Sequence, residues 1–252
     1  MDRSRLIFIT VALVAAGFLQ LVTSVSVPLG MVPEAVDDMY DGCREKMEKK
    51  VNNTYFKKEN VGEFKEAWQE AENCSNIQSL PEDKALTKTH KLAICVYTSR
   101  DVYKEFNTAV RTGKNIYSSS FRFHSLHFWL TTAIQILNNN QSCHTTYRRT
   151  GTVFTGKLND IIRFGMFASS SKYSDLTPFG NETCFQIETC SGAYLNDYSV
   201  FNDEEEVLIP PYETFKITHI YEGRAQRPWL RQVHHSTETL VKTGPPQHRD
   251  PG

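Results

Sequence analysis

The sequence predicts an α+β fold in which helices precede strands. Up to about residue 137, apolar residues recur at intervals of three and four, which is the spacing of one buried helix face. From Thr145 onward, short β-branched and aromatic segments are broken by Gly, Pro, Asn and Asp, as in strands joined by turns. Helices first and strands second favour segregated layers over a βαβ repeat. Because no GxGxxG lies between a strand and a helix, a doubly wound dinucleotide domain is excluded.

The N-terminus has the layout of a secretory signal peptide. Two arginines precede an apolar run over residues 6–21, and small residues follow at Ser24 and Ser26. We therefore expect residues 1–26 to be a signal that is cleaved near one of these serines, which makes the protein secreted. The alternative is an uncleaved membrane anchor, because residues 6–27 are almost long enough to span a bilayer.

Composition agrees with export. The chain has six cysteines, an even number without a CxxC pair, as expected of an oxidised exported protein, and their spacing does not fit a metal site. A net charge of -1, from 28 basic and 29 acidic residues, gives no reason to expect a nucleic-acid partner. Four Asn-x-Ser/Thr motifs predict glycosylation at Asn52, Asn73, Asn140 and Asn181.

Five amphipathic segments fill the first half of the chain. The helices are expected at about 33–51, 64–71, 86–97 (after Pro81), from Ser99 or Asp101 to Gly113, and 124–137. In the first, Val36, Tyr40 and Met47 share one apolar stripe. The glycine after the fourth is a suitable helix stop. Phe128 and Trp129 in the fifth are interpreted as core residues.

The second half is predicted to form strands. The strand-like segments are Thr145–Tyr147, Ile161–Phe167, Cys184–Cys190, Val207–Ile209 and Phe215–Tyr221. Strict alternation, as in Phe185, Ile187 and Thr189, indicates half-buried strands. The polar end, Thr237–Gly252, is rich in Pro, Gly and His and is predicted to be a disordered tail without the hydrophobic end that a lipid anchor signal needs. The nearby His234 and His235 are interpreted as surface tail.

An acidic triplet in FNDEEEVLIPPYETF is a candidate catalytic feature. If Glu204 to Ile209 is extended, Glu204 and Glu206 lie on one face and Glu205 on the other. Two neighbouring carboxylates suit a reaction through a sugar cation, since one stabilises the cation and the other orients or deprotonates the nucleophile. The alternative is a solvated acidic turn before a buried strand, and spacing alone favours it because charge runs usually face water.

Two further polar features precede this triplet in the strand-rich half. Arg148 follows a short strand in TTYRRT, and Ser169 opens a serine triplet. With their flanking strings HSLHFWLTTAIQIL, RFGMFASSS, ETCSGAY and EEEVLIPPYETF, these features resemble the arginine-specific mono-ADP-ribosyltransferase ectoenzymes, within the Arg-Ser-Glu class shared with cholera-type toxins. The resemblance covers roughly residues 33–221.

The resemblance implies an ADP-ribosyltransferase fold, in which an N-terminal helical part packs on a C-terminal antiparallel or mixed β-sandwich. A single catalytic domain would span residues 27–236, with its helical part at about 33–137 and its strand-rich part at about 143–236, followed by the tail 237–252. The protein would be a monomeric transferase of the glycosyltransferase class.

The resemblance also implies NAD, or NADP, as co-substrate and no permanently bound cofactor. Arg148 corresponds to the arginine that positions the dinucleotide, and Tyr147 before it would also contact it. Ser169 corresponds to the serine that holds the nicotinamide half and the catalytic glutamate. Glu206 matches the carboxylate that binds the ribose hydroxyl and stabilises the cation, while Glu204 matches the glutamate that makes an arginine the acceptor.

These roles are physically reasonable. The guanidinium of Arg148 offers paired donors in a fixed plane, and the hydroxyl of Ser169 can both donate and accept. Glu206 would stabilise a charge that exists only in the transition state, and Glu204 would orient the acceptor and take its proton. Glu205, which faces away, is expected to tolerate substitution. The implied reaction is ADP-ribose transfer to arginine on extracellular or luminal proteins, with NAD hydrolysis or an inactive binding protein as alternatives.

Two departures from the family pattern stand out. Glycine commonly follows the motif arginine, whereas Arg149 stands here and would either crowd the dinucleotide or help to bind its phosphates. The family usually ties its first helix to the C-terminal region by a disulfide, but no cysteine follows Cys190. Cys43 would then pair with Cys74 or Cys95 or remain free, with Cys184 also unassigned. Cys143 with Cys190 resembles the family's second bridge.

Overall fold

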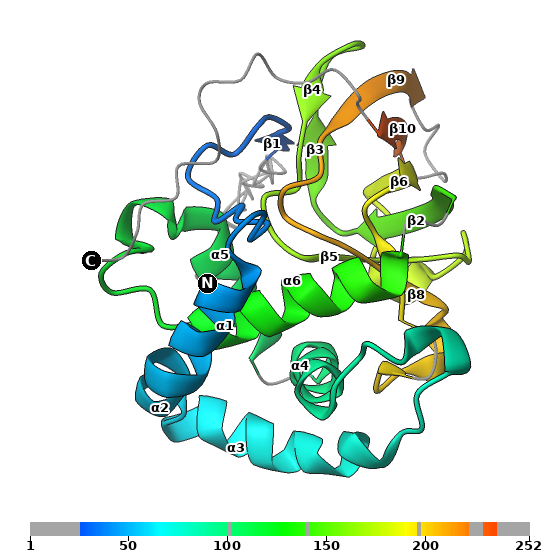
Figure 1. Cartoon of the computed structure of the whole chain (residues 1–252). Helices are drawn as coiled ribbons and strands as arrows, with labels where there is room; N and C mark the ends of the chain where they lie inside the picture. Colours follow the sequence, from blue (N-terminus) through cyan, green and yellow to red (C-terminus); the bar gives the residue numbers. More distant parts are fainter. Residues whose placement is uncertain (1–25, 100–101, 140–141, 196–197, 222–228, 236–252) are drawn as a thin grey trace, which may run out of the picture.

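The computed structural model describes residues 26–99, 102–139, 142–195, 198–221 and 229–235. Helices gather on one side of a sheet (Figure 1), which confirms the predicted α+β class. Most of the predicted signal, the predicted tail and the Asn140 glycosylation site lie outside the described residues. No helix in these ranges has the length and hydropathy needed to span a bilayer.

The helices occupy the first half of the chain. They are α1 (Arg44–Lys50), α2 (Phe56–Glu59), α3 (Gly62–Glu70), α4 (Lys88–Thr98), α5 (Tyr103–Thr112) and α6 (His124–Asn138). A π-helical turn covers Val51–Tyr55, and 3-10 turns cover Ala71–Asn76, Pro81–Asp83 and Lys114–Ile116. Two further 3-10 turns, Thr177–Phe179 and Asn202–Glu204, lie among the strands of the second half. α6 lies between α3 and α4 and the strands (Figure 1), and Leu126, Leu130 and Ile134 on it are fully buried. Phe128 and Trp129 are core residues, as predicted.

The first predicted helix, 33–51, is wrong over its first eleven residues, 33–43. Tyr40 and Gly42 have positive φ values of 60° and 72°, so the helix begins only at Arg44. The side chain of Asp38 accepts a hydrogen bond from the Tyr40 backbone N–H at 2.8 Å, which is a turn-forming contact. Val36 and Tyr40 are nevertheless buried, and the Val36 backbone N–H donates a hydrogen bond to the Val110 carbonyl of α5 at 2.7 Å.

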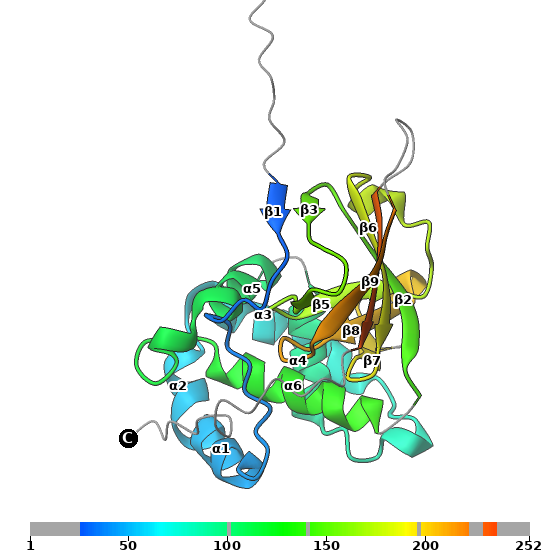
Figure 2. The same cartoon turned by 90° about the horizontal axis from the view of Figure 1, so that it is seen from above.

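The strands form an eight-stranded sheet and a separate pair. The sheet order is β4 (Ile161–Ile162), β9 (Phe215–Tyr221), β10 (Trp229–His235), β6 (Thr183–Thr189), β2 (His144–Thr150), β5 (Ala168–Ser171), β8 (Glu206–Ile209) and β7 (Ala193–Tyr194). β10 and β6 are parallel, and the other neighbours are antiparallel. β1 (Ser26–Pro28) lies beside β3 (Val153–Thr155) in a parallel pair (Figure 2).

Two strand predictions are corrected. The segment Ile161–Phe167 is strand only over its first two residues, and Gly165, with φ of 66°, separates it from β5. His234 and His235, interpreted as surface tail, belong to β10, whose backbone pairs with β9 on one side and β6 on the other. This strand depends on distant pairing partners, which local sequence patterns do not reveal.

The described residues, which include all six cysteines, contain two disulfides. Cys74 is bonded to Cys95, so neither of them pairs with Cys43. Cys143 is bonded to Cys190, as the resemblance implies. Cys43 is a half-buried thiol and Cys184 a buried one.

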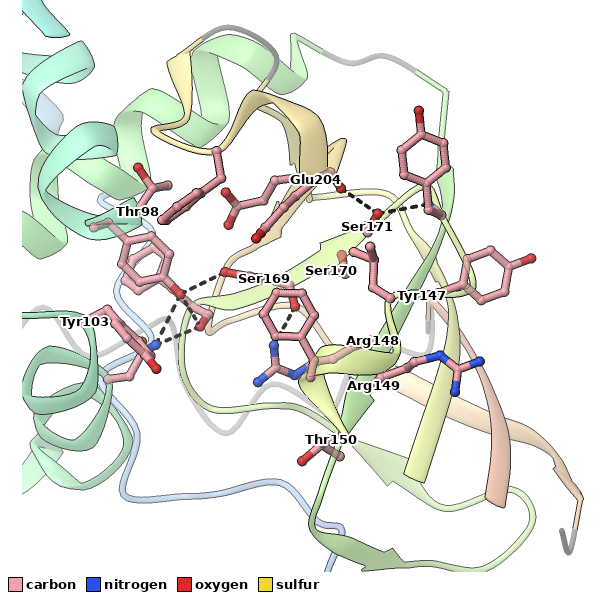
Figure 3. A pocket seen from close by; sticks show the side chains of 18 of the residues that line it. Thr98, Tyr103, Tyr147, Arg148, Arg149, Thr150, Ser169, Ser170, Ser171 and Glu204 are labelled. Atoms are coloured by element: carbon pink, nitrogen blue, oxygen red, sulfur yellow. Dashed lines mark hydrogen bonds between the residues drawn. The ribbon is translucent and has the colours of Figure 1, made fainter. Parts of the chain in front are cut away.

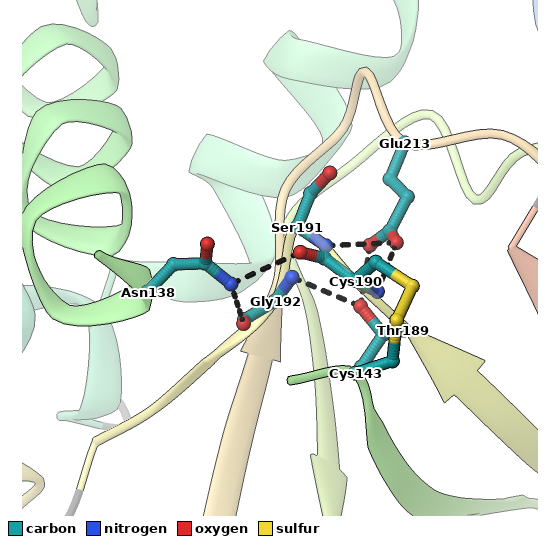
Figure 4. Close-up of a disulfide and its surroundings, with 7 residues drawn as sticks. All are labelled: Asn138, Cys143, Thr189, Cys190, Ser191, Gly192 and Glu213. Carbon is teal, nitrogen blue, oxygen red and sulfur yellow. Dashed lines mark hydrogen bonds between the residues drawn. A yellow bond between two sulfur atoms is a disulfide. The ribbon is translucent and has the colours of Figure 1, made fainter. Parts of the chain in front are cut away.

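The second bridge holds the turn between β6 and β7 (Figure 4). Glu213 accepts hydrogen bonds from the backbone N–H groups of Cys190 and Ser191 at 2.7 and 3.0 Å. Asn138, at the end of α6, donates to the carbonyls of Cys190 and Gly192 at 3.1 and 2.8 Å. The end of α6 and the segment after β8 are thereby joined to this turn, and they fix the start of β7.

A buried carboxylate holds the beginning of α6. Glu59 accepts hydrogen bonds from the backbone N–H groups of His124 and Ser125, each at 2.9 Å, and its Oε1 lies 2.9 Å from His124 Nδ1. These groups would otherwise be unpaired donors at a helix start, where negative charge is also favourable. Burial alone would raise the pKa of Glu59, but the hydrogen bonds from His124 and Ser125 together lower it below its usual value.

We expect Glu59→Ala to lower the free energy of unfolding by about 1–3 kcal/mol, because buried donors lose their acceptor. Since the folded pKa is lowered, the contribution of Glu59 is present above its unfolded pKa and is lost as the pH falls through the folded value. Denaturant unfolding between neutral and acid pH measures both effects. The exposed Glu63→Ala is the matched control, and equal behaviour of the two variants would contradict the assignment.

Candidate active site

A cavity of about 530 Å³ lies between the α4–α5 side of the helical part and strands β2, β5 and β8 (Figure 3). The sequence-predicted site residues share it, although they come from three strands and a turn. Its lining includes Tyr147, Arg148, Ser169, Glu204 and Glu206. Strand register accounts for part of this gathering, because Ser171 of β5 faces both Tyr147 of β2 and Glu206 of β8.

Arg148 is fixed against the neighbouring strand. Its Nη1 donates a hydrogen bond to the Ser169 carbonyl at 2.5 Å (Figure 3). Burial lowers the pKa of this guanidinium, and the positive charge of Arg111 lowers it further, whereas Tyr97 and Glu206 raise it. Among the described residues, the Ser169 carbonyl is the one acceptor bonded to Arg148, so the other donors of this group remain available to an anionic or carbonyl oxygen.

The helices supply polar groups that sequence reasoning missed. Tyr97, on α4, donates to the Phe167 carbonyl at 2.8 Å, and its oxygen lies 3.5 Å from Ser169 Oγ. Asn107, on α5, donates to the Tyr97 hydroxyl and to the Phe167 carbonyl at 3.2 and 3.1 Å. Burial raises the pKa of Tyr97 to about 12, so its hydroxyl stays protonated at neutral pH. In the sequence, Tyr97 is the last residue of the predicted helix 86–97, and nothing there pairs it with β5.

Glu206 begins β8 and is 7% exposed. Its Oε2 accepts a hydrogen bond from the Ser199 hydroxyl at 2.9 Å. Burial raises the pKa of Glu206, and the negative charge of Glu204 raises it further, against the hydrogen bonds of Ser169 and Ser199 and the charge of Arg148. A carboxylate in these surroundings interacts strongly with a positive charge that develops beside it, because little water is present to screen it.

The predicted extended run from Glu204 is wrong at its start. Glu204 ends a 3-10 turn, Glu205 has left-handed φ and ψ values of 46° and 50°, and the strand begins at Glu206. Glu204 and Glu206 still line the same cavity, because the left-handed residue between them replaces strand alternation. The backbone of Glu204 and Glu205 is thus a turn before a buried strand, as one alternative predicted. The side chains of Glu204 and Glu206 nevertheless line one cavity, as the other alternative predicted. Glu205 is not among the residues that line the cavity, consistent with the prediction that it faces away.

Arg149 extends away from Arg148 (Figure 3). Its Nε donates a hydrogen bond to the Ser174 carbonyl at 2.8 Å, in the loop that follows β5. The side chain therefore ties this loop to β2. The sequence predicted that Arg149 would either crowd the dinucleotide or bind its phosphates, and it gave no sign of this contact with Ser174.

The described residues contain no group of three or more His, Cys, Asp or Glu side chains that could hold a metal ion. The cavity is instead lined by aromatic, hydroxyl, cationic and carboxylate groups. This set suits a polar organic ligand with both anionic and aromatic parts.

Comparisons with known proteins agree with the predicted resemblance. A profile of the family described as NAD:arginine ADP-ribosyltransferase matches residues 29–236. Ecto-ADP-ribosyltransferase 5 of Rattus norvegicus is 38% identical over 220 residues, which covers 79% of this chain and 70% of the relative. The erythroblast NAD(P)(+)–arginine ADP-ribosyltransferase of Gallus gallus is 36% identical over 204 residues, which covers 76% of this chain and 67% of the relative.

A solved structure gives the same result for the fold. A mutant of the eukaryotic mono-ADP-ribosyltransferase ART2.2 in complex with NAD superposes with a TM-score of 0.70 at 32% identity, covering 82% of this chain and 93% of the other. The ADP-ribosyltransferase fold is thus confirmed. With the family profile extending over most of its residues, the chain belongs to the NAD:arginine ADP-ribosyltransferase family.

Proposed function

We propose that the protein transfers ADP-ribose from NAD, or NADP, to arginine side chains of extracellular or luminal proteins and releases nicotinamide. The observation that carries this proposal is the pair of carboxylates, Glu204 and Glu206, in one cavity with Arg148 and Ser169. The names of the relatives, which include arginine ADP-ribosyltransferases and an NAD complex, support the same reaction class.

Binding of the dinucleotide would rest on Arg148 and its neighbours. The guanidinium is already oriented by the Ser169 carbonyl, so it presents its remaining donors without further loss of side-chain freedom. Tyr147 and Ser169 line the same cavity and would contact the nicotinamide half. We assign Arg148, Tyr147, Ser169 and Glu206 to dinucleotide binding.

Glu206 would act on the bond that breaks. As the bond between the ribose C1′ and the nicotinamide nitrogen lengthens, its electron pair leaves with nicotinamide and positive charge builds on the ribose. The buried carboxylate of Glu206 would accept a hydrogen bond from a ribose hydroxyl and stabilise this charge. Its effect should therefore be larger on turnover than on binding.

Glu204 would act on the bond that forms. A guanidinium nitrogen of the acceptor attacks C1′, and the acceptor gives up one proton as the new bond forms. Glu204 is half-buried at the same cavity, where it can orient the cationic acceptor and receive that proton. An enzyme without this acid would be expected to let water take the place of arginine.

We propose residues 27–236 as the single catalytic domain and residues 1–26 as a cleaved signal. The names of the relatives as ectoenzymes support an extracellular or luminal location. β1 begins at Ser26, so a cut after residue 26 would remove its first residue, whereas a cut near Ser24 would leave the whole β1–β3 pair intact.

The reaction is tested by incubating the purified mature chain with labelled NAD and an arginine-rich acceptor. We expect labelled acceptor from the wild type, and a loss of about 10²–10³-fold in turnover for Glu206→Ala with a smaller change in KM for NAD. The exposed Glu188→Ala, elsewhere on the sheet, is the control. No labelled acceptor from the wild type, or undiminished labelling by Glu206→Ala, would refute the proposal.

Glu204→Gln should change both the product and the pH dependence. Loss of the acid favours hydrolysis, so free ADP-ribose should replace labelled acceptor. Because the charge of Glu204 raises the pKa of Glu206, its removal should move the acid limb of NAD cleavage to lower pH. Product analysis and a pH profile of kcat/KM measure these effects. An acid limb that moves upward would be inconsistent with this electrostatic coupling, and a wild type that makes only free ADP-ribose would be a hydrolase.

Arg149→Gly distinguishes an enzyme from an inactive scaffold. If Arg149 blocked the site, the glycine variant would gain NAD binding by calorimetry. Because Arg149 instead holds the loop after β5, we expect the wild type to bind NAD and the variant to bind about fivefold more weakly, the equivalent of one hydrogen bond. Binding by the glycine variant alone would favour the inactive scaffold.

A further inference from the structure

The turn between the two site glutamates has an uncommon backbone. Glu205 is in the left-handed region, which non-glycine residues rarely adopt, and it lies directly between Glu204 and Glu206. A change at this residue would alter the direction in which Glu204 leaves the strand. Something in the surrounding structure must therefore favour this conformation.

The backbone of Glu205 is held from the β5 side. Lys172, the residue after β5, donates its N–H to the Glu205 carbonyl at 3.1 Å. Ser171, the last residue of β5, donates its hydroxyl to the Glu204 carbonyl at 2.6 Å. The bonding of β5 thus continues past the beginning of β8 and onto the turn that precedes it.

The side chain of Glu205 is held from both sides. Oε1 accepts a hydrogen bond from the Tyr194 hydroxyl at 2.9 Å, at the end of β7, and Oε2 lies 3.3 Å from Lys172 Nζ. The same Lys172 ammonium lies 3.0 Å from the centroid of the Tyr194 ring, which is a cation–π contact. Each of the three side chains therefore contacts the other two, across the ends of β5, β8 and β7. We call Lys172, Tyr194 and Glu205 the turn clamp.

The turn clamp acts differently on the two glutamates. Glu206 is placed by the β8 ladder, in which it pairs with Ser171, and its carboxylate is held by Ser199. Glu204 lies beyond the ladder, in the 3-10 turn, so its position depends on the backbone conformation of Glu205. Loosening the clamp should therefore displace Glu204 more than Glu206.

We propose that Glu205 is a positioning residue, which the turn clamp holds in a left-handed conformation so that Glu204 meets the acceptor guanidinium. This inference rests on the proposed function and adds that the clamp sets the ratio of arginine transfer to NAD hydrolysis. It replaces the expectation that Glu205 tolerates substitution.

The test measures that ratio, with labelled NAD and agmatine as a small guanidine acceptor. We expect Glu205→Ala to lower the ratio about tenfold, with KM for NAD little changed, since a small displacement of a reacting group has effects of this size. Tyr194→Phe should lower the ratio about fivefold, for the loss of one hydrogen bond. The double variant should be no worse than Glu205→Ala, because the two side chains act through one contact. Glu205→Gln, which keeps an acceptor for Tyr194, should retain more transfer than Glu205→Ala.

Two further variants separate positioning from folding. Glu205→Gly accepts the left-handed backbone without a side chain, so a wild-type ratio in this variant would overturn the role of the clamp. Glu72→Ala removes an exposed ion pair with Lys88 and is the control for loss of a surface charge. Thermal unfolding is followed for each variant. A purely structural role would lower transfer and hydrolysis together and leave the ratio unchanged.

The outcomes distinguish this inference from the proposed function. A wild type that transfers ADP-ribose to agmatine, with an unchanged ratio in Glu205→Ala and Tyr194→Phe, would overturn the inference alone. A wild type that never transfers ADP-ribose would overturn the proposed function, and the inference with it.

Discussion

The pairing of β8 with its two neighbours is the constraint on which the site depends. All four residues of β8 are buried, and its backbone bonds to β5 on one side and β7 on the other. This register sets Glu206 opposite Ser171, and Ser171 is also the point where β5 meets β2. A slip of one residue in β8 would turn Glu206 away from the cavity and put an apolar side chain in its place.

The helical part supports this strand arrangement and completes the site chemically. α6 is buried along most of its length and has a carboxylate at its beginning and a disulfide-linked turn at its end. Tyr97 and Asn107 reach from the helices to the carbonyl of Phe167, directly before β5. β5 is therefore held between β2 and β8 in the sheet, and the residue before it is held by the helices. Such rigidity is what a site needs when its catalysis relies on groups already in place.

Much of this architecture could be predicted from the sequence, and the failures have physical reasons. The order of helices and strands follows from periodicity, and the site residues follow from a family resemblance that their own spacing could not establish. The sequence did not reveal the positive φ at Tyr40, the distant pairing of β10 or the left-handed turn at Glu205. The pairing of β10 and the turn at Glu205 depend on contacts between distant segments, whereas the turn at Tyr40 includes a local contact with Asp38. The turn at Glu205 matters for the proposed function, because two glutamates separated by one residue suggested an alternating strand, whereas a turn places both at one cavity.

The central claim is that one cavity binds the dinucleotide between Arg148, Ser169 and Glu206, with Glu204 left for the acceptor. The most direct measurement is a crystal structure of the Glu206→Ala variant with NAD. The account predicts an oxygen of NAD within hydrogen-bonding distance of the Arg148 guanidinium and the nicotinamide ribose facing residue 206. NAD bound elsewhere on the protein, or bound in this cavity with the ribose directed away from residue 206, would contradict it.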